Sequence, residues 1–312
     1  MATYGEGYYE QTSVDGEDAG NTDLAVLYRI GKPIKGKPII DYTLTEDIVS
    51  RDVMGQYYPS LEAGNQTVEQ IRLNFYPVNA NFLYWMLGKR SAAVGNARTI
   101  QNMDGTSGGI GGTTGFKPRL ALWKQTNNSK RHVYGCVFGS MNLAWGNANN
   151  GMQVSMQGIG MSNGTDTFTP TITYLQSESD LWTHVDAMTW DSGDLTPYGL
   201  TLQTQQSLDS NVGYTGTIDN VNEFSSIIGE YKLICSAANG ESLLVDYNAK
   251  AAKDFAWTVK KAADSTQYIT FTTTNARIGT LIKQEVLNEE PIYTIGIKIQ
   301  NLVCTVTDGL VA

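Results

Sequence analysis

The stretch Tyr134–Gly160, YGCVFGSMNLAWGNANNGMQVSMQGIG, decides the fold. Its first part places apolar residues at every second position, with Ser140 and Asn142 on the other side, which is the period of a half-buried β-strand. The Asn- and Gly-rich run at 147–151 predicts a turn into a second strand. The apolar alternation of that strand changes face at Gly158, which predicts a β-bulge or a strong twist there. The stretch therefore predicts an antiparallel hairpin.

The residues before this hairpin predict two further strands and a helix. The segment 41–48 (DYTLTEDI) alternates polar and apolar residues, and 68–76 (VEQIRLNFY) reads as a second strand. The apolar run at 82–87 fits a short helix that ends at Gly88. A strand at 120–123 then leads toward the hairpin.

The second half of the chain repeats this order of elements. The segment 198–205 (YGLTLQTQ) matches the strand at 41–48, and 241–247 (ESLLVDY) matches the strand at 68–76. In 254–261 (DFAWTVKK), Phe255 and Val259 lie four residues apart, which predicts the counterpart of the short helix. Three more strands are expected, at 268–271, 277–287 and 292–304.

The repeated order predicts an internal duplication, with the first half longer between its helix and its next strand. It divides the chain into an N-terminal arm at 1–23, a first β domain at 24–162, a connector at 163–195 and a second β domain at 196–312. The predicted class is mainly β, with two tandem β-sandwiches that each carry a short flanking helix.

Composition excludes several classes of protein. The 312 residues carry a net charge of −9, so the chain as a whole is not an electrostatic binder of nucleic acid or of anionic membranes. Three cysteines that form no C-x-x-C pair predict neither a disulfide framework nor a zinc site. We expect no signal peptide and no membrane span.

No catalytic signature emerges from the sequence. The Gly-rich run at 105–115 lacks the Gly-Lys-[Ser/Thr] ending of a phosphate-binding loop, and it follows the predicted helix instead of preceding it. The two histidines, His132 and His184, are too few for a metal cluster, and the adjacent acids Glu289 and Glu290 would point to opposite faces of a strand. We therefore expect no enzyme activity, no cofactor and no metal.

The hairpin at 134–160 and the segment 240–261 (GESLLVDYNAKAAKDFAWTVKK) resemble the major tail tube proteins of long-tailed, non-contractile, siphovirus-like viruses of bacteria or archaea. The resemblance covers about residues 24–308. It implies a β-sandwich flanked by a short helix, in which one sheet joins those of its neighbours into a closed barrel. Most such tubes stack hexameric rings, whereas some members fuse two tube domains and stack trimers. The predicted duplication favours homotrimeric rings with pseudo-hexameric symmetry, with a homohexamer as the alternative.

The resemblance also implies the partners and the location of the protein. It implies a structural virion protein of the tail, assembled in the host cytoplasm and polymerised into a conduit for viral DNA delivery. The implied partners are further copies of the chain, a tape-measure protein, tail terminator and baseplate or tip proteins, and double-stranded DNA in passive transit, but no membrane. Six domains that give four strands each would close a barrel of about 24 strands and about 48 Å diameter.

A conduit should not bind DNA, so its wall should be acidic or neutral and polar. The lumen should then be lined by the polar sides of the barrel strands. The lumen-facing candidates are Asp41, Thr43, Thr45, Asp47, Ser140, Asn142, Thr201, Gln203 and Gln205, with Lys298 and Gln300 as weaker ones. Lys298 runs against the expected charge. Long loops at 51–67 and 209–240 are expected to reach a neighbouring subunit, and Tyr4, Tyr8 and Tyr9 of the arm to stack rings.

Two other functions remain open from the sequence. One is a carbohydrate-binding or depolymerising β-protein of a viral tail fibre, because six tryptophans could form a sugar platform. Such a protein would expose tryptophans in a cleft. The other is a shell or baseplate-hub component that is structural but not tubular.

Overall fold

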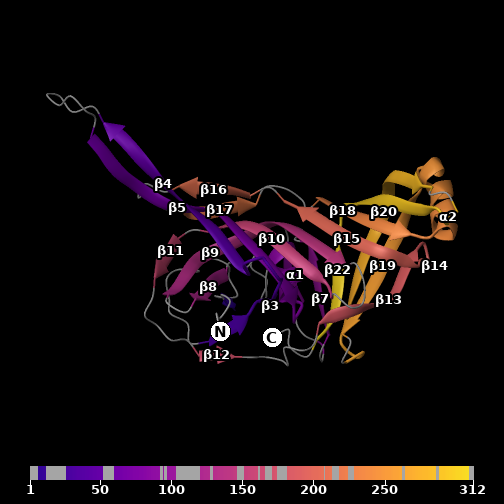
Figure 1. The fold of residues 1–312 in the computed structure, drawn as a ribbon, viewed down its shortest axis with the longest axis horizontal. Helices are drawn as coiled ribbons and strands as arrows, with labels where there is room; N and C mark the ends of the chain where they lie inside the picture. The colour runs from indigo at the N-terminus through magenta and orange to yellow at the C-terminus, as the bar shows by residue number, and fades with distance from the viewer. Residues whose placement is uncertain are drawn as a thin grey trace.

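The computed structural model describes residues 6–11, 26–51, 60–91, 94, 97–102, 120–126, 129–145, 151–160, 162–165, 171–173, 181–206, 208–212, 218–223, 228–261, 264–285 and 288–308. The protein is mainly β. Within these residues there are two helices, α1 (Asn81–Leu87) and α2 (Ala237–Ala249). Twenty strands form one connected sheet, and β16 (Leu208–Val212) and β17 (Ile218–Glu223) form a separate pair (Figure 1).

Most strands belong to two sets with the same pairing. The N-terminal set is β1 (Glu6–Gln11), β4 (Ile40–Arg51), β5 (Ser60–Pro77), β8 (Leu120–Thr126), β9 (Ser129–Trp145), β10 (Gln153–Gly160) and β11 (Ser162–Thr165). The C-terminal set is β13 (Trp182–Trp190), β15 (Pro197–Gln205), β18 (Ile228–Cys235), β19 (Ala252–Lys261), β20 (Tyr268–Gln284), β21 (Ile292–Ile299) and β22 (Val303–Thr307). The remaining strands are β2 (Val26–Arg29), β3 (Gly31–Pro33), β6 (Gly88–Arg90), β7 (Ala97–Asn102), β12 (Thr171–Thr173) and β14 (Gly193–Asp194).

The pairing of the two sets matches strand by strand. The N-terminal set pairs in the order β1–β8–β9–β10–β5–β4, with β11 also on β9. The C-terminal set pairs as β13–β19–β20–β21–β18–β15, with β22 also on β20. The irregularities match too. The β9–β10 ladder skips Gly139 and the β20–β21 ladder skips Gly279.

Strands of the two sets pair directly with each other in one ladder. β9 pairs with β15 over six residue pairs, from Trp145 opposite Leu200 to Ser140 opposite Gln205. The result is a continuous antiparallel sheet in the order β4–β5–β10–β9–β15–β18–β21–β20, with four strands from each set. We call this the eight-stranded sheet.

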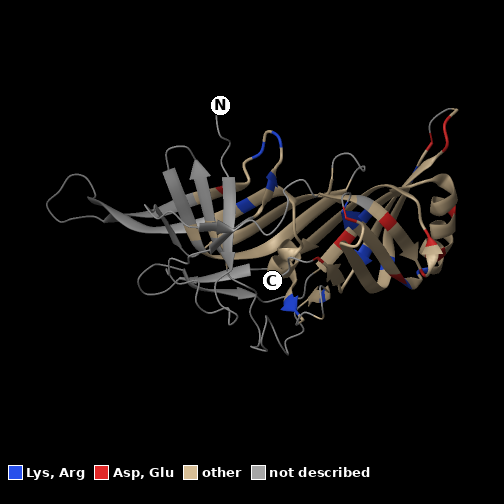
Figure 2. Cartoon of the chain, turned by 90° about the horizontal axis from the view of Figure 1, so that it is seen from below, with Lys and Arg blue, Asp and Glu red and all other residues tan. Residues whose placement is uncertain are grey.

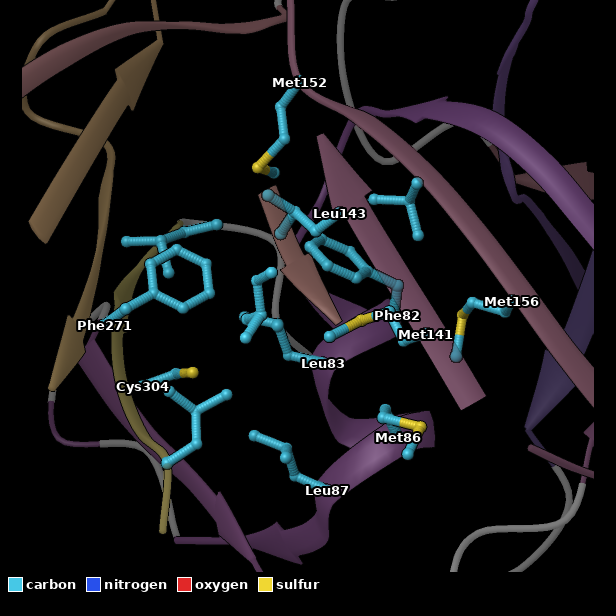
Figure 3. Close-up of a cluster of buried hydrophobic side chains, with 14 of the residues drawn as sticks. Phe82, Leu83, Met86, Leu87, Met141, Leu143, Met152, Met156, Phe271 and Cys304 are labelled. Atoms are coloured by element: carbon cyan, nitrogen blue, oxygen red, sulfur yellow. The ribbon is translucent and has the colours of Figure 1, made fainter. Parts of the chain in front are cut away.

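One face of the eight-stranded sheet carries the core. A row of directly paired, fully buried residues crosses six strands: Phe75, Val154, Leu143, Leu202, Tyr231 and Ile297. Helix α1 packs on this face, where Phe82 and Met86 lie among Met141, Leu143 and Met156 of the sheet (Figure 3). Phe271 and Cys304 of the C-terminal set belong to the same cluster, so both sets share one core.

Helix α1 confirms the predicted helix and its end. The Asn79 side chain accepts a hydrogen bond from the backbone N–H of Asn81 at 3.0 Å. Gly88 ends the helix in the left-handed conformation at φ 86°, where a side chain would be strained.

The bulge predicted at Gly158 is also confirmed. The β10 register shifts next to this residue against both β9 and β5. A Cβ atom on Gly158 would lie 2.1 Å from the carbonyl oxygen of Val137, so only glycine allows this approach of β9.

Two elements of the second half were predicted wrongly. The segment 241–247, expected as a strand, lies in α2, and 254–261, expected as a helix, lies in β19. The spacing of Phe255 and Val259 fits both periods, because residues four apart share a face in a helix and in a strand. Trp257 between them is buried on that same face and stacks on Phe271, with ring centroids 4.1 Å apart, as a strand requires.

The loops, the connector and the arm also need correction. Much of the loop expected at 51–67 is strand β5, and the one expected at 209–240 contains β17, β18 and the start of α2. The connector expected at 163–195 contains β13, which pairs with β19 and buries Trp182 and Trp190. Residues 6–11 of the expected N-terminal arm form β1, which pairs with β8 within the same chain.

Candidate functional site

The face of the eight-stranded sheet opposite the core is polar. We call it the polar face, and its polar members on the first seven strands include Asp41, Thr43, Gln70, Arg72, Asn74, Ser140, Asn142, Gln153, Ser155, Gln157, Thr201, Gln203, Gln205, Glu230, Lys232 and Lys298. By the same registers, the exposed residues Ile228 of β18 and Arg277, Thr280, Ile282 and Gln284 of β20 also lie on this face. All of them are exposed or half-buried. Because side chains alternate along each strand, the same pattern that buries the core row sets these residues on the opposite side.

The members of the polar face form rows across the strands. One row of direct pairs runs through Asn74, Ser155, Asn142, Gln203, Glu230 and Lys298. The row next to it runs through Asp41, Arg72, Gln157, Ser140 and Gln205. Both rows cross the β9–β15 junction without a break, so the two sets present one surface.

Short polar contacts link neighbours within this surface. Ser155 Oγ donates to Asn74 Oδ1 at 2.9 Å, and Lys298 forms an ion pair with Glu230. Around them lies an open hollow of about 640 Å³, lined by members of both rows and by Ile228, which is 67% exposed. A wide, shallow hollow lined by amides and hydroxyls suits contact with water better than capture of a small ligand.

The described part of the polar face is not rich in carboxylates and carries more bases than acids. Its described charges are two acids, Asp41 and Glu230, and four bases, Arg72, Lys232, Arg277 and Lys298. Much of the long central strands is drawn in tan in Figure 2, which marks residues other than Lys, Arg, Asp and Glu. That the lumen wall is acidic or neutral and polar stays a prediction.

The structure brings most of the lumen-facing candidates together. Seven of the nine, Asp41, Thr43, Ser140, Asn142, Thr201, Gln203 and Gln205, are members of the polar face. Thr45 and Asp47 belong to β4, but their side chains lie outside the described part of the chain. Lys298 is a member, and Gln300 is exposed just beyond the end of β21. That this face lines a bore stays a prediction.

The structure says less about the tyrosines expected to stack rings than about the lumen-facing candidates. Tyr8 and Tyr9 belong to β1, where they stand opposite Trp123 and Leu122 in the β8 ladder. Tyr4 lies outside the described residues, and so does the Gly-rich run 105–115. A role in stacking rings stays a prediction for all three tyrosines.

Sequence reasoning missed the contribution of β18. Glu230 and Lys232 stand in the middle of the polar face, but their segment was expected to be a loop. The signal was present in GEYKLIC, where Tyr231, Leu233 and Cys235 alternate with polar or half-buried residues.

The two edges of the eight-stranded sheet are open within the described residues. β4 pairs only with β5, and residues 278–284 of β20 pair only with β21. Exposed apolar side chains lie on both faces of the sheet at the β20 end, and Ile282, on the polar face, is 53% exposed. Helix α2 beside it exposes Val245 and Tyr247 to 66% and 39%.

The described residues hold no group of three or more His, Cys, Asp or Glu side chains that could bind a metal ion. Their three cysteines are free and buried. Burial raises the pKa of the Cys136 and Cys304 thiols, and it raises that of Cys235 to about 11, which disfavours the reactive thiolate. Neither described helix is long and apolar enough to cross a membrane.

Compared with known proteins, the sequence matches no protein-family model and no curated protein.

Proposed function

We propose that this chain is the repeating subunit of a hollow tube, the major tail tube protein of a long-tailed, non-contractile virus of bacteria or archaea. One observation carries the proposal. The eight-stranded sheet takes four strands from each of two equivalently paired sets, has one polar face, and ends in two open edges. This is the unit that a ring of such sheets would repeat.

The matched pairing supports a duplication of one tube domain. Seven strands and one helix recur in the same chain order and with the same neighbours, and each set skips a glycine at the equivalent bulge. The domains would be those predicted at 24–162 and 196–312, extended by β1 and β13.

Ring closure follows from the open edges. An exposed sheet edge invites uncontrolled association, and a closed barrel removes it. Three copies with eight strands each would form a barrel of about 24 strands and about 48 Å diameter. A homohexamer, the alternative, would form a barrel with twice as many strands and twice the diameter.

The polar face would line the bore. Most of its members are Ser, Thr, Asn and Gln, and Lys298 is paired with Glu230, so few cations would contact DNA phosphates and DNA could pass without being held. In the virion the tube would surround a tape-measure protein and meet tail terminator and baseplate or tip proteins at its ends.

Negative-stain electron microscopy of the purified protein tests the proposal. We expect rings with a central hole or hollow filaments of uniform width. Compact particles without a hole at every protein and salt concentration would contradict it.

Thiol labelling tests the orientation of the polar face. Asn142→Cys should react with a small maleimide in tubes but resist a large polymer-linked maleimide, and it should react with both after dissociation. Thr266→Cys, in an exposed turn away from this face, is the matched control and should react with both reagents throughout. Equal access of the large reagent to both sites in tubes would place the polar face outside.

The alternative of a carbohydrate platform finds little support. Trp85, Trp182, Trp190 and Trp257 are buried, and Trp145 is half-buried with its indole N–H donating to the Thr183 carbonyl. The side chain of Trp123 lies outside the described part.

A further inference from the structure

We infer that the open edge of β20 in one copy pairs with the open edge of β4 in a second copy, antiparallel and in the register of the β9–β15 ladder. The inference rests on the proposed self-assembly. It adds what that proposal leaves open, which is the identity of the two edges and the register in which they meet.

The first step is the match between β20 and β9. After its skipped glycine, β9 places Ser140 opposite Gln157, and β20 places Thr280 opposite Gly296. Ser140 and Thr280 are therefore equivalent. Counting along both strands, Asn142 corresponds to Ile282, and Ala144 corresponds to Gln284.

The second step is the match between β4 and β15. Gln157 stands opposite Arg72, which stands opposite Asp41. The equivalent path from Gly296 leads to Lys232 and then to Thr201. Asp41 is therefore equivalent to Thr201, and Thr43 is equivalent to Gln203.

The ladder inside the chain then predicts the ladder between chains. Asn142 stands opposite Gln203, and Ala144 stands opposite Thr201. The equivalent pairs are Ile282 opposite Thr43, and Gln284 opposite Asp41, of the second copy. No like charges meet in these pairs, and an amide faces a carboxylate in the second.

The exposed apolar side chains at this end support the same contact. α1 follows β5 as α2 follows β18, but all residues of α1 are buried, partly by the neighbouring set, whereas Val245 and Tyr247 of α2 are exposed. Figure 1 places α2 and β20 at one end of the molecule and β4 toward the other. The contact is therefore head-to-tail, and it closes a ring when the rotation between copies is right.

Disulfide trapping tests the register. The double variant Ile282→Cys/Thr43→Cys should form covalent dimers and larger oligomers on mild oxidation, because directly opposite Cβ atoms lie about 5 Å apart. Ile282→Cys/Asp41→Cys, shifted by two residues on the same face, is the matched control and should cross-link at least about tenfold less, since diagonal neighbours are about 7–8 Å apart. The native thiols are buried and should give no background. Equal or stronger cross-linking of the shifted pair would overturn the register.

Hydrogen exchange of the unmodified protein tests the edges without any substitution. Assembly should protect the backbone amides of 40–45 and 278–284. Hollow tubes with no added protection there would overturn the inference and leave the proposed function intact. Cross-linked rings that never stack into tubes would support the inferred pairing of the edges and contradict the proposed tube.

Discussion

The two helices of the molecule follow equivalent strands but have different surroundings. All seven residues of α1 are buried, whereas only Gly240 and Leu243 are buried among the thirteen of α2. Helix α1 lies near the β9–β15 junction, within the core shared by both sets, and α2 lies at the open β20 edge. Burial at these positions therefore depends on whether a neighbouring set is present, and not on the repeated unit alone.

An insertion after α1 contributes to this difference in burial between the two helices. Residues 88–119 separate α1 from β8, whereas only 250 and 251 separate α2 from β19. A longer first half was predicted here from a helix at 254–261 that is in fact strand β19, but the spacing of the observed elements differs in the predicted direction. The insertion contains β7, which pairs with β22 of the C-terminal set and so ties the two sets together beside α1.

The largest effect should come from truncating the two helices. Trp85→Ala should lower the free energy of unfolding by about 4 kcal/mol, because it empties a large, fully buried site. Val245→Ala should change it by less than about 0.5 kcal/mol in the dissociated chain, since the side chain is exposed and alanine favours helix. Denaturant unfolding measures both values.

The same variants separate the dissociated chain from its assemblies. Val245→Ala should weaken self-association if a second copy covers α2, which sedimentation velocity would detect. A loss of several kcal/mol for Val245→Ala in the dissociated chain would show that α2 is already buried there, and the contrast between the helices would fail.

A smaller contrast is expected between the sheet junction and the sheet edge. Leu143 is fully buried in the β9–β15 ladder, and its equivalent in β20 is Lys283. Leu143→Ala should cost about 3 kcal/mol of unfolding free energy. Lys283→Ala removes exposed ion pairs with Glu241 and Glu285 and should leave the unfolding free energy nearly unchanged. Similar losses at both positions would mean that the β20 edge is as well packed as the junction.

The sequence predicts the strands of this sheet better than their neighbours. The alternation in 41–48, 134–145 and 198–205 is regular enough to identify both the strands and their polar sides. A pair of apolar residues at i and i+4 could not show that 254–261 is a strand and 241–247 a helix, because such a pair shares one face in both structures.

The pairing of β9 with β15 could not be predicted from the sequence, for another reason. It joins segments about 60 residues apart, and no local pattern specifies which of two polar-faced strands becomes the partner. The open edges follow from this pairing, so they could not be predicted either.

Alkaline pH tests whether the two sets unfold as one unit. Burial raises the pKa of Cys136 in the N-terminal set and of Cys235 and Cys304 in the C-terminal set above the usual value of about 9. The folded protein then keeps protons that the unfolded chain releases, so stability is complete below about pH 9 and falls as pH rises further. Each thiol should contribute a loss of about 1.4 kcal/mol per pH unit.

The variant Cys235→Ala isolates one of these contributions. Between pH 9 and about pH 11 its unfolding free energy should fall less steeply than that of the natural protein, by about 1.4 kcal/mol per pH unit. Hydrogen exchange of peptides from β9–β10 and β20–β21 should show both hairpins losing protection at the same pH, because they share one core. Loss of β20–β21 first would show that the sets unfold separately.

The smallest effect is expected on the polar face. Lys298 and Glu230 form an ion pair whose side chains are 57% and 34% exposed, so water and salt screen the attraction. Lys298→Gln should therefore change the unfolding free energy by less than about 1 kcal/mol, and the same change at Lys232 serves as the control for a nearby base on the same strand ladder. If neither substitution changes the unfolding free energy, folding does not require these charges. The molecule that faces this surface could then determine which charges are needed there. A loss of several kcal/mol at Lys298 alone would instead make the ion pair a structural link between β18 and β21, and the polar face would then owe its charge pattern to the fold.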